Sequence, residues 1–246
     1  EVRVRFSLRP PEIMNLDNLN NLIELFSLQV SKQNKKDIFL EWLNPLNKKT
    51  YTWEETQNNI LKLSKIIREN IKEDDRCLLV SENRPEWFIS DIAIMLSGGI
   101  TVPAYTTYTE DDYKYLIEDC EPSLVIVSNN EMLKKLNNTI NEKKFIKKII
   151  TLDEVNKVTN SLKIINKNKY LDFNSIIKNN LLEEDKIQNN KLKRTSPACI
   201  IYTSGTGGNP KGVILSHGGI LNNLVGASEI LKPLIDSRPV FLTWLP

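Results

Sequence analysis

A loop rich in glycine and hydroxyl residues, from Thr203 to Gly212, carries the side chains best suited to chemistry in this 246-residue chain. Four of its glycines can turn backbone N–H groups toward an anion, because no Cβ stands in the way. Two threonines and a serine add hydroxyl donors, and Lys211 adds a positive charge. Pro210 restricts the loop and so lowers the cost of ordering it on binding. This composition predicts a phosphate-binding loop, since an ordinary turn needs only one or two glycines.

Two common nucleotide-binding patterns do not fit this loop. The P-loop pattern requires a glycine before the lysine and a hydroxyl residue after it. Here Pro210 precedes Lys211 and Gly212 follows it. The dinucleotide pattern G-x-G-x-x-G also fails, because proline occupies the position of its last glycine. Both nucleotide-binding folds are therefore disfavoured.

The run from Tyr202 to Gly212, YTSGTGGNPKG, resembles the signature loop of the adenylate-forming superfamily, [YF]-T-S-G-[ST]-T-G-x-P-K-G. The match covers ten of eleven positions. Gly207 stands where threonine is usual, which removes a hydroxyl donor but keeps the backbone N–H. Residues 51–55 (YTWEE), 81–87 (SENRPEW) and 98–103 (GGITVP) are also similar to this superfamily. Residues 213–217 and 242–246 are most similar to its long-chain fatty acyl-CoA synthetases.

This resemblance implies a two-step reaction that consumes ATP, with Mg²⁺, and uses CoA as the second substrate. A fatty acid carboxylate attacks the α-phosphate of ATP, and the CoA thiol then displaces AMP from the acyl-adenylate. Carried over from the family, Lys211 and Thr206 are the catalytic residues. The implied phosphate contacts are Thr203, Ser204, Gly205, Thr206, Gly207, Gly208 and Lys211. No metal ligand is assigned, because the family's acidic metal contact lies further along its sequence.

Helices and strands that alternate along the chain must position this loop. Apolar spacing and a T-x-x-E capping box predict a helix that begins near Thr52 and turns Trp53, Ile60, Leu63 and Ile67 inward. Similar signals predict helices over 15–30, 85–96 and 109–120, and one from about 218 whose inward face carries Ile220, Leu224, Ala227 and Leu231. Short apolar runs predict strands at 77–80, 100–104, 123–128, 198–203, 213–216 and 240–244. Continuous apolar strands between helices predict an α/β fold, with parallel-sheet layers covered by helices on both faces.

The domain organisation predicted from these patterns is one incomplete N-terminal AMP-binding domain over residues 14–246. Residues 1–13 are interpreted as a non-native leader outside the fold. Residues 129–195 are interpreted as a Lys/Asn-rich, weakly patterned connection. The chain is thus expected to be a fragment that does not ligate CoA by itself, whereas its parent protein is expected to do so.

Composition and charge exclude several other classes. Three distant cysteines and a single histidine argue against a disulfide framework or a multi-histidine metal site. His217 lies at a strand-to-helix junction, where a structural role is predicted rather than catalysis. Residues 129–195 hold 15 Lys and Arg against 8 Asp and Glu, but this segment has few of the interleaved aromatic residues and arginines that favour nucleic-acid binding. The stretch 87–105 contains Asp91, two glycines and Pro103, so a helix followed by a strand explains it better than a transmembrane helix.

Three alternatives to the long-chain ligase stay open at this point. One is an acid-activating ligase for aryl or medium-chain acids. Another is a truncated, non-catalytic binding module, and the third is nucleic-acid binding through residues 129–195, which predicts steep salt dependence. For the long-chain ligase, the expected partners are small molecules: fatty acid, ATP and CoA. No nucleic-acid partner and no transmembrane helix are expected. The expected location is cytoplasmic, and peripheral membrane association of the parent enzyme is left open.

Overall fold

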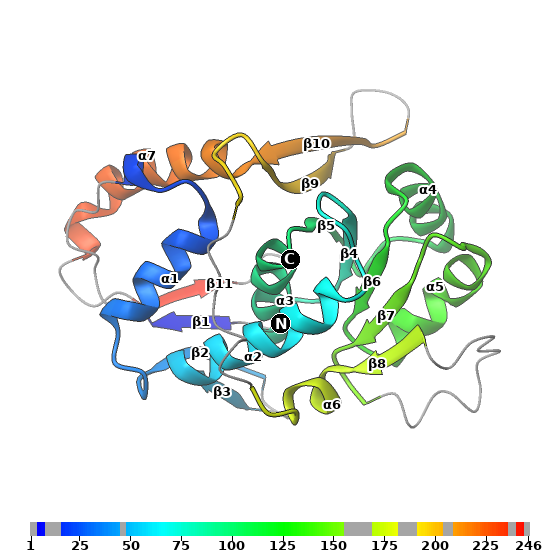
Figure 1. Cartoon of the computed structure of the whole chain (residues 1–246), viewed down its shortest axis with the longest axis horizontal. Helices are drawn as coiled ribbons and strands as arrows, with labels where there is room; N and C mark the ends of the chain where they lie inside the picture. The colour runs from blue at the N-terminus through cyan, green and yellow to red at the C-terminus, as the bar shows by residue number, and fades with distance from the viewer. Residues whose placement is uncertain are drawn as a thin grey trace.

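Two β-sheets organise the chain, as the ribbon view in Figure 1 shows. The structure is a computed structural model, and it describes residues 4–7, 16–44, 48–154, 169–181, 191–203, 209–235 and 240–243. The larger sheet has the strand order β10-β9-β5-β4-β6-β7-β8. Its strands are β4 (Arg76–Val80), β5 (Ile100–Ala104), β6 (Leu124–Val127), β7 (Lys148–Thr151), β8 (Tyr170–Asp172), β9 (Pro197–Thr203) and β10 (Lys211–Ser216). All neighbouring pairs are parallel except the edge pair β9 and β10, which is antiparallel.

The central strands are buried on both faces, which explains their uninterrupted apolar sequences. Successive residues of β4 point to opposite faces: Cys77 and Leu79 belong to one buried cluster, Leu78 and Val80 to the other. Strand β6 alternates in the same way. The sheet is therefore covered on both sides, and the predicted α/β class is confirmed.

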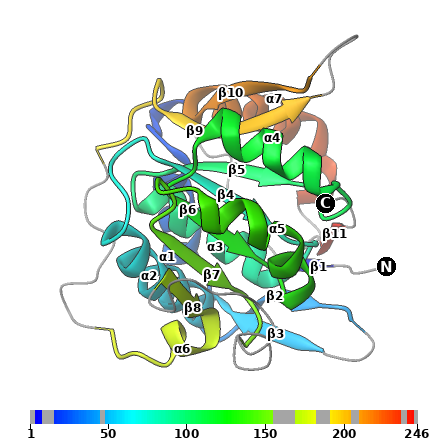
Figure 2. The same ribbon diagram turned by 90° about the vertical axis from the view of Figure 1, so that its right-hand side faces the viewer.

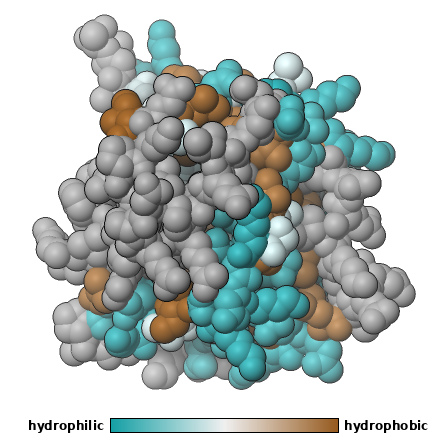
Figure 3. Space-filling view, turned by 90° about the vertical axis from the view of Figure 1, so that its left-hand side faces the viewer, coloured by the Kyte–Doolittle hydropathy of each residue, from teal (hydrophilic) through white to brown (hydrophobic). Residues whose placement is uncertain are grey.

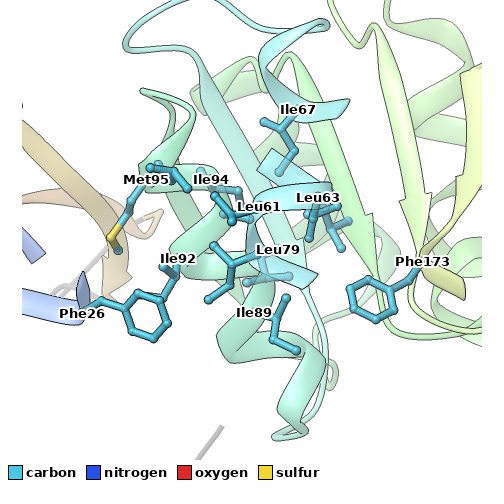
Figure 4. Close-up of a cluster of buried hydrophobic side chains, with 14 of the residues drawn as sticks. Phe26, Leu61, Leu63, Ile67, Leu79, Ile89, Ile92, Ile94, Met95 and Phe173 are labelled. Atoms are coloured by element: carbon cyan, nitrogen blue, oxygen red, sulfur yellow. The ribbon is translucent and has the colours of Figure 1, made fainter. Parts of the chain in front are cut away.

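Helices cover the two faces of this sheet in separate layers. On one face lie α1 (Leu22–Lys32), α2 (Trp53–Arg68), α3 (Pro85–Leu96) and α6 (Phe173–Ile177). On the other lie α4 (Glu110–Cys120) and α5 (Asn130–Glu142), which stand in front of the sheet in Figure 2. In the core of the first layer, Leu63 and Ile67 of α2 converge with Ile89 of α3 and Leu79 of β4, all fully buried (Figure 4).

Local signals in the sequence account for where these helices begin. Thr52 and Glu55 form the predicted capping box, in which each side chain accepts the other's backbone N–H. Thr109 and Asp112 form a second one at the start of α4. The predicted helix over 15–30 is divided into the 3-10 helix η1 (Leu16–Asn18) and α1. The reason is that the Asn21 side chain accepts the Ile23 and Glu24 N–H groups and begins a new helix there.

The smaller sheet is antiparallel, with the order β11-β1-β2-β3. It consists of β1 (Val4–Ser7), β2 (Ile38–Trp42), β3 (Lys49–Thr52) and β11 (Val240–Thr243). The expectation that residues 1–13 lie outside the fold is wrong for residues 4–7, because β1 pairs with β2 on one side and β11 on the other. Whether that segment is native to the protein stays a prediction.

Residues 129–195 contribute more to the fold than a surface connection would. Helix α5 begins at an Asn129 cap and buries Met132, Leu133, Leu136 and Ile140, with lysines on its other side. Strands β7 and β8 extend the parallel sheet beyond β6. The weakly patterned connection is therefore a wrong prediction for residues 130–151 and 170–177, whose apolar residues are few but placed at helix and strand spacing.

Helix α7 (His217–Ile235) buries the predicted face only in part, since Ile220 packs against the first buried cluster as predicted. Leu221 is fully buried, one turn after the buried His217, whereas Leu224 is 38% exposed. The side chain of Leu231 lies outside the described residues. Ile230 is 81% exposed, and α7 lies at the end of the molecule that Figure 3 faces, where both apolar and polar residues reach the surface.

Candidate functional site

The hairpin of β9 and β10 brings together the two ends of the predicted phosphate loop. In its antiparallel register Thr203 pairs with Lys211, and Tyr202 pairs with Gly212. The side chains of Thr203 and Lys211 are both exposed, so each is accessible to a ligand. The other predicted phosphate contacts, Ser204, Gly205, Thr206, Gly207 and Gly208, lie outside the described residues, and their roles stay predictions.

The position of the hairpin in the sheet is one where open α/β folds bind ligands. Strand β9 runs parallel to β5, with Cys199 paired to Thr101, so its carboxyl end lies on the same sheet edge as those of the central strands. Ligands of such folds bind outside the carboxyl ends of the strands. The loop that follows Thr203 starts at that edge.

Close packing between Tyr202 and Gly212 shapes the base of the hairpin. A Cβ on Gly212 would lie 2.8 Å from Ile200 Cγ2 and 3.2 Å from the Tyr202 ring, so only glycine fits without displacement of its neighbours. The Tyr202 side chain is buried, and its hydroxyl donates a hydrogen bond to the Asp119 carboxylate. Burial, together with this hydrogen bond, raises the pKa of Tyr202 well above its usual value. The phenol therefore stays protonated at neutral pH and keeps its donor role.

A second contact from helix α4 reaches the loop's other end. The Tyr115 hydroxyl donates to the Pro210 carbonyl at 2.9 Å, one residue before Lys211. The sequence analysis missed Tyr115 and Asp119, because both lie on a helix far from the loop along the chain. Their spacing of four residues, on the side of α4 beside its buried face, is the one signal that could have drawn attention to them.

His217 is enclosed where three distant segments meet. The residue is 1% exposed, and its ring Nδ1 accepts the Leu22 backbone N–H at 3.4 Å. The backbone N–H of His217 donates to the Ser196 carbonyl. Burial lowers the pKa of His217 to about 4, so the imidazole is neutral at pH 7. The neighbouring Ser216 hydroxyl accepts the Gly219 N–H at the start of α7. These contacts give His217 the structural role that the sequence predicts.

The SENRPEW run at residues 81–87 folds into a buried ion-pair network. Arg84 Nε lies 2.9 Å from Glu86 Oε2, and both side chains are 1% exposed. Arg84 also reaches Asp153, and its guanidinium lies 4.8 Å from the centre of the Trp42 ring. Burial opposes ionisation of Glu86, but Arg84 and Lys49 outweigh it and lower the pKa of that carboxyl to about 2. Carboxylates already neutralise Arg84, so the network does not form an anion site. It includes Trp42 and Lys49 of the smaller sheet and therefore joins the two sheets.

Within the described residues, no group of three or more His, Cys, Asp or Glu side chains is placed to hold a metal ion. Nor is any helix in that part of the chain both long enough and apolar enough to cross a bilayer.

The fold and the glycine-rich hairpin define the class of protein. Residues 26–246 match the family model described as AMP-binding enzyme, and the chain belongs to that family. This confirms the resemblance that the loop motif indicates.

Among curated relatives, the chain is 32% identical over 200 residues to "Long chain acyl-CoA synthetase 3" of Arabidopsis thaliana, a match that covers 79% of this chain and 30% of that protein. It is 32% identical over 172 residues to "Long-chain-fatty-acid--CoA ligase ACSBG2" of Gallus gallus, covering 67% of this chain and 21% of that protein. The chain thus spans less than a third of the length of these relatives.

A solved structure supports the fold. The chain is similar to an anthranilate CoA ligase in complex with anthranoyl-AMP, with a TM-score of 0.66 and 20% identity over 83% of this chain and 36% of that one.

Proposed function

We propose that this chain is part of an ATP-dependent, AMP-forming ligase that joins a long-chain fatty acid to CoA. The observation that carries the proposal is the glycine- and hydroxyl-rich loop, whose two ends, Thr203 and Lys211, are paired at the carboxyl edge of the sheet. Membership of the AMP-binding family and the names of the relatives support it. Because the chain spans 30% of the first relative, the activity is proposed for the parent protein, the full-length product of the gene that encodes this chain.

In the first step, a fatty acid carboxylate oxygen attacks the α-phosphorus of ATP. The bond from that phosphorus to the bridging oxygen of pyrophosphate breaks, which gives acyl-adenylate and pyrophosphate. In the second step, the sulfur of CoA attacks the acyl carbon and loses its proton, and AMP leaves with the electron pair of the broken C–O bond. The products are acyl-CoA and AMP.

The loop's proposed task is to stabilise the negative charge that grows on the leaving pyrophosphate. Lys211 supplies a positive charge, and the hydroxyls of Thr203, Ser204 and Thr206 supply donors, with backbone N–H groups of Gly205, Gly207 and Gly208 between them. Of these, Lys211 and Thr206 are proposed as catalytic residues. Donors held in place before the reaction act most strongly, because they need no reorganisation as charge develops.

Mg²⁺ is proposed as the ion that accompanies ATP. The described residues contain no acidic cluster that could hold it, so no step is assigned to an ion bound by this part of the chain. CoA is proposed as a substrate only. The fatty acid partitions into bilayers, so the proposed setting of the parent is the cytoplasm with peripheral membrane association, in fatty acid metabolism.

The test is Lys211→Ala in the parent protein, assayed by fatty-acid-dependent exchange of pyrophosphate into ATP. We expect the rate to fall about 10²- to 10³-fold, the usual loss when one preorganised charge-stabilising donor is removed. Lys72→Ala is the matched control: Lys72 is exposed and precedes β4, at the opposite edge of the sheet. An unchanged rate in Lys211→Ala would refute the phosphate role.

The substrate class is tested by an acyl chain-length profile on the parent. The highest kcat/KM is expected for long-chain acids, and a preference for aryl or medium-chain acids would replace that part of the proposal. The 246-residue chain alone is expected to form no acyl-CoA, and detection of acyl-CoA would contradict this. A parent that lacks any exchange activity would favour a binding module.

A further inference from the structure

Helix α4 forms hydrogen bonds with strand β9 and with the residue that immediately precedes β10, close to the phosphate loop, and the two views in Figures 1 and 2 place it beside the hairpin. Tyr115 donates to the Pro210 carbonyl at 2.9 Å, immediately before β10. Asp119 accepts from the Tyr202 hydroxyl, near the end of β9. Each bond therefore involves a residue next to the paired loop residues Thr203 and Lys211: Tyr202 precedes Thr203, and Pro210 precedes Lys211.

The spacing of the two α4 residues matches the geometry of a helix surface. Residues four apart lie one above the other on the same side of a helix, so Tyr115 and Asp119 can face the same hairpin. The adjacent side of α4 is anchored, because Tyr113, Leu116 and Ile117 are at most 2% exposed in the second buried cluster. Helix α4 is thus a fixed element of the core that presents two polar groups to the hairpin.

The hairpin needs such support because β10 is an edge strand. Its one partner strand in the described part of the chain is β9, and residues 211–215 are exposed. The side chains of Val213 and Ile214 are 45% and 63% exposed, so little packing holds this strand within the described residues. Close to the loop, the Tyr115 bond to Pro210 and the bond from Tyr202 to Asp119 join the hairpin to helix α4, and the packing of Tyr202 against Gly212 holds its two strands together.

We propose that Tyr115 and Asp119 are positioning residues for the phosphate loop, which hold its two strands so that Thr203 and Lys211 face the same phosphate group. This inference rests on the proposed function of the loop. The two residues do not touch the nucleotide themselves. They act through Pro210 and Tyr202 and lower the reorganisation that the loop needs when charge develops on the leaving pyrophosphate.

The test uses Tyr115→Phe and Asp119→Asn in the parent protein. Tyr115→Phe removes only the hydroxyl that reaches Pro210, and Asp119→Asn keeps the shape of the side chain but removes its charge. Tyr170→Phe is the control for the first variant, because it deletes a hydroxyl that donates to Asn141 at the far edge of the same sheet. Glu118→Gln is the control for the second, because it removes a neighbouring exposed carboxylate of α4 that pairs with Lys143.

We expect kcat for ATP–pyrophosphate exchange to fall about tenfold in Tyr115→Phe, as for the loss of roughly one net hydrogen bond in the transition state. In Asp119→Asn the amide oxygen can still accept from Tyr202 but carries no charge, so a smaller fall of about fivefold is expected. The KM for the fatty acid should stay within about twofold, since the acid does not touch the hairpin in the proposal, and both controls should stay within about twofold throughout. A second measurement, amide hydrogen exchange of the 246-residue chain, should show faster exchange in β10 of the test variants than in the controls.

The outcomes separate this inference from the function on which it rests. If Lys211→Ala inactivates the parent while Tyr115→Phe and Asp119→Asn match their controls, the positioning role is wrong and the proposed function stands. If the two variants lose activity only in proportion to a loss of melting temperature, the contacts are merely structural and the inference is again wrong. If Lys211→Ala is itself silent, the proposed function fails and the inference fails with it.

Discussion

Replacing Glu86 by glutamine should destabilise the chain strongly, because it breaks a fully buried charge pair. The Glu86 carboxylate accepts hydrogen bonds from Arg84, Lys49 and Tyr51, each at 2.9 Å, and the residue is completely buried. Its pKa falls from 4.5 to about 2 on folding. At 1.36 kcal/mol per pKa unit, the carboxylate contributes about 3 kcal/mol at neutral pH. Loss of one partner of a buried pair costs a similar amount, about 3–5 kcal/mol, because the other charge remains.

The assay is thermal and urea unfolding of the 246-residue chain. A loss of about 3 kcal/mol should lower the melting temperature by about 6–12 °C in a chain of this size. The matched variant Glu118→Gln removes an exposed carboxylate whose surface ion pair contributes little to stability. A Glu86→Gln variant that unfolds at the same temperature as Glu118→Gln would refute the reasoning.

The pH dependence gives an independent test of the same pair. A lowered pKa means that the folded state binds the proton less tightly, so this stability is present above pH 4.5 and is lost as the pH falls toward 2. Wild-type chain should therefore lose about 3 kcal/mol more than Glu86→Gln over that range. Parallel curves for the two proteins would contradict the assignment of the shift to Glu86.

Two further predictions concern the junction at the start of α7. The lowered pKa of His217 means that its stabilising contribution, up to about 3 kcal/mol, is present above pH 6.5 and is lost as the pH falls to about 4. The unfolding free energy of His217→Asn should therefore depend less on pH in that range than that of the wild-type chain. An equal pH dependence of the two proteins would contradict this. Gly218→Ala should cost about 1–3 kcal/mol in urea unfolding, because its Cβ would lie 2.8 Å from the Arg194 carbonyl oxygen. Gly226→Ala, in the same helix with no atom within 4 Å of the new Cβ, should instead stabilise by about 0.5–1 kcal/mol, and equal effects would refute the packing argument.

Features determined by neighbouring residues could be predicted from the sequence. The capping box at Thr52 and Glu55 involves groups three residues apart, and the structure contains it. Strand β5 has the predicted bounds, because Gly98 and Gly99 end the preceding helix and the apolar run that follows is continuous. In the same way, the β9–loop–β10 order could be recognised from the YTSGTGGNPKG run, since a loop motif carries its own turn chemistry.

Features that depend on distant pairing could not be predicted in this way. Strand β1 has no distinctive composition, and it belongs to the fold only because β2 and β11 supply partners on both sides.

Helix α5 was missed for a different reason. It lies in a segment whose overall composition is polar, yet the few apolar residues at helical spacing are the buried ones. Average composition over a long segment therefore obscured a pattern that was present at the scale of one helix turn.

The support of the phosphate loop combines both situations. The loop's chemistry lies in consecutive residues, so Lys211 and its glycine neighbours stand out in the sequence. The side chains that would keep those residues in position come from α4, where Tyr115 is 95 residues before its partner Pro210 and Asp119 is 83 residues before Tyr202. A half-buried tyrosine and an exposed aspartate on one helix have no local signature of such a role, because only the tertiary fold brings them to the loop. A loop motif therefore indicates which groups meet the phosphate, whereas the packing of a neighbouring helix determines how firmly those groups are held.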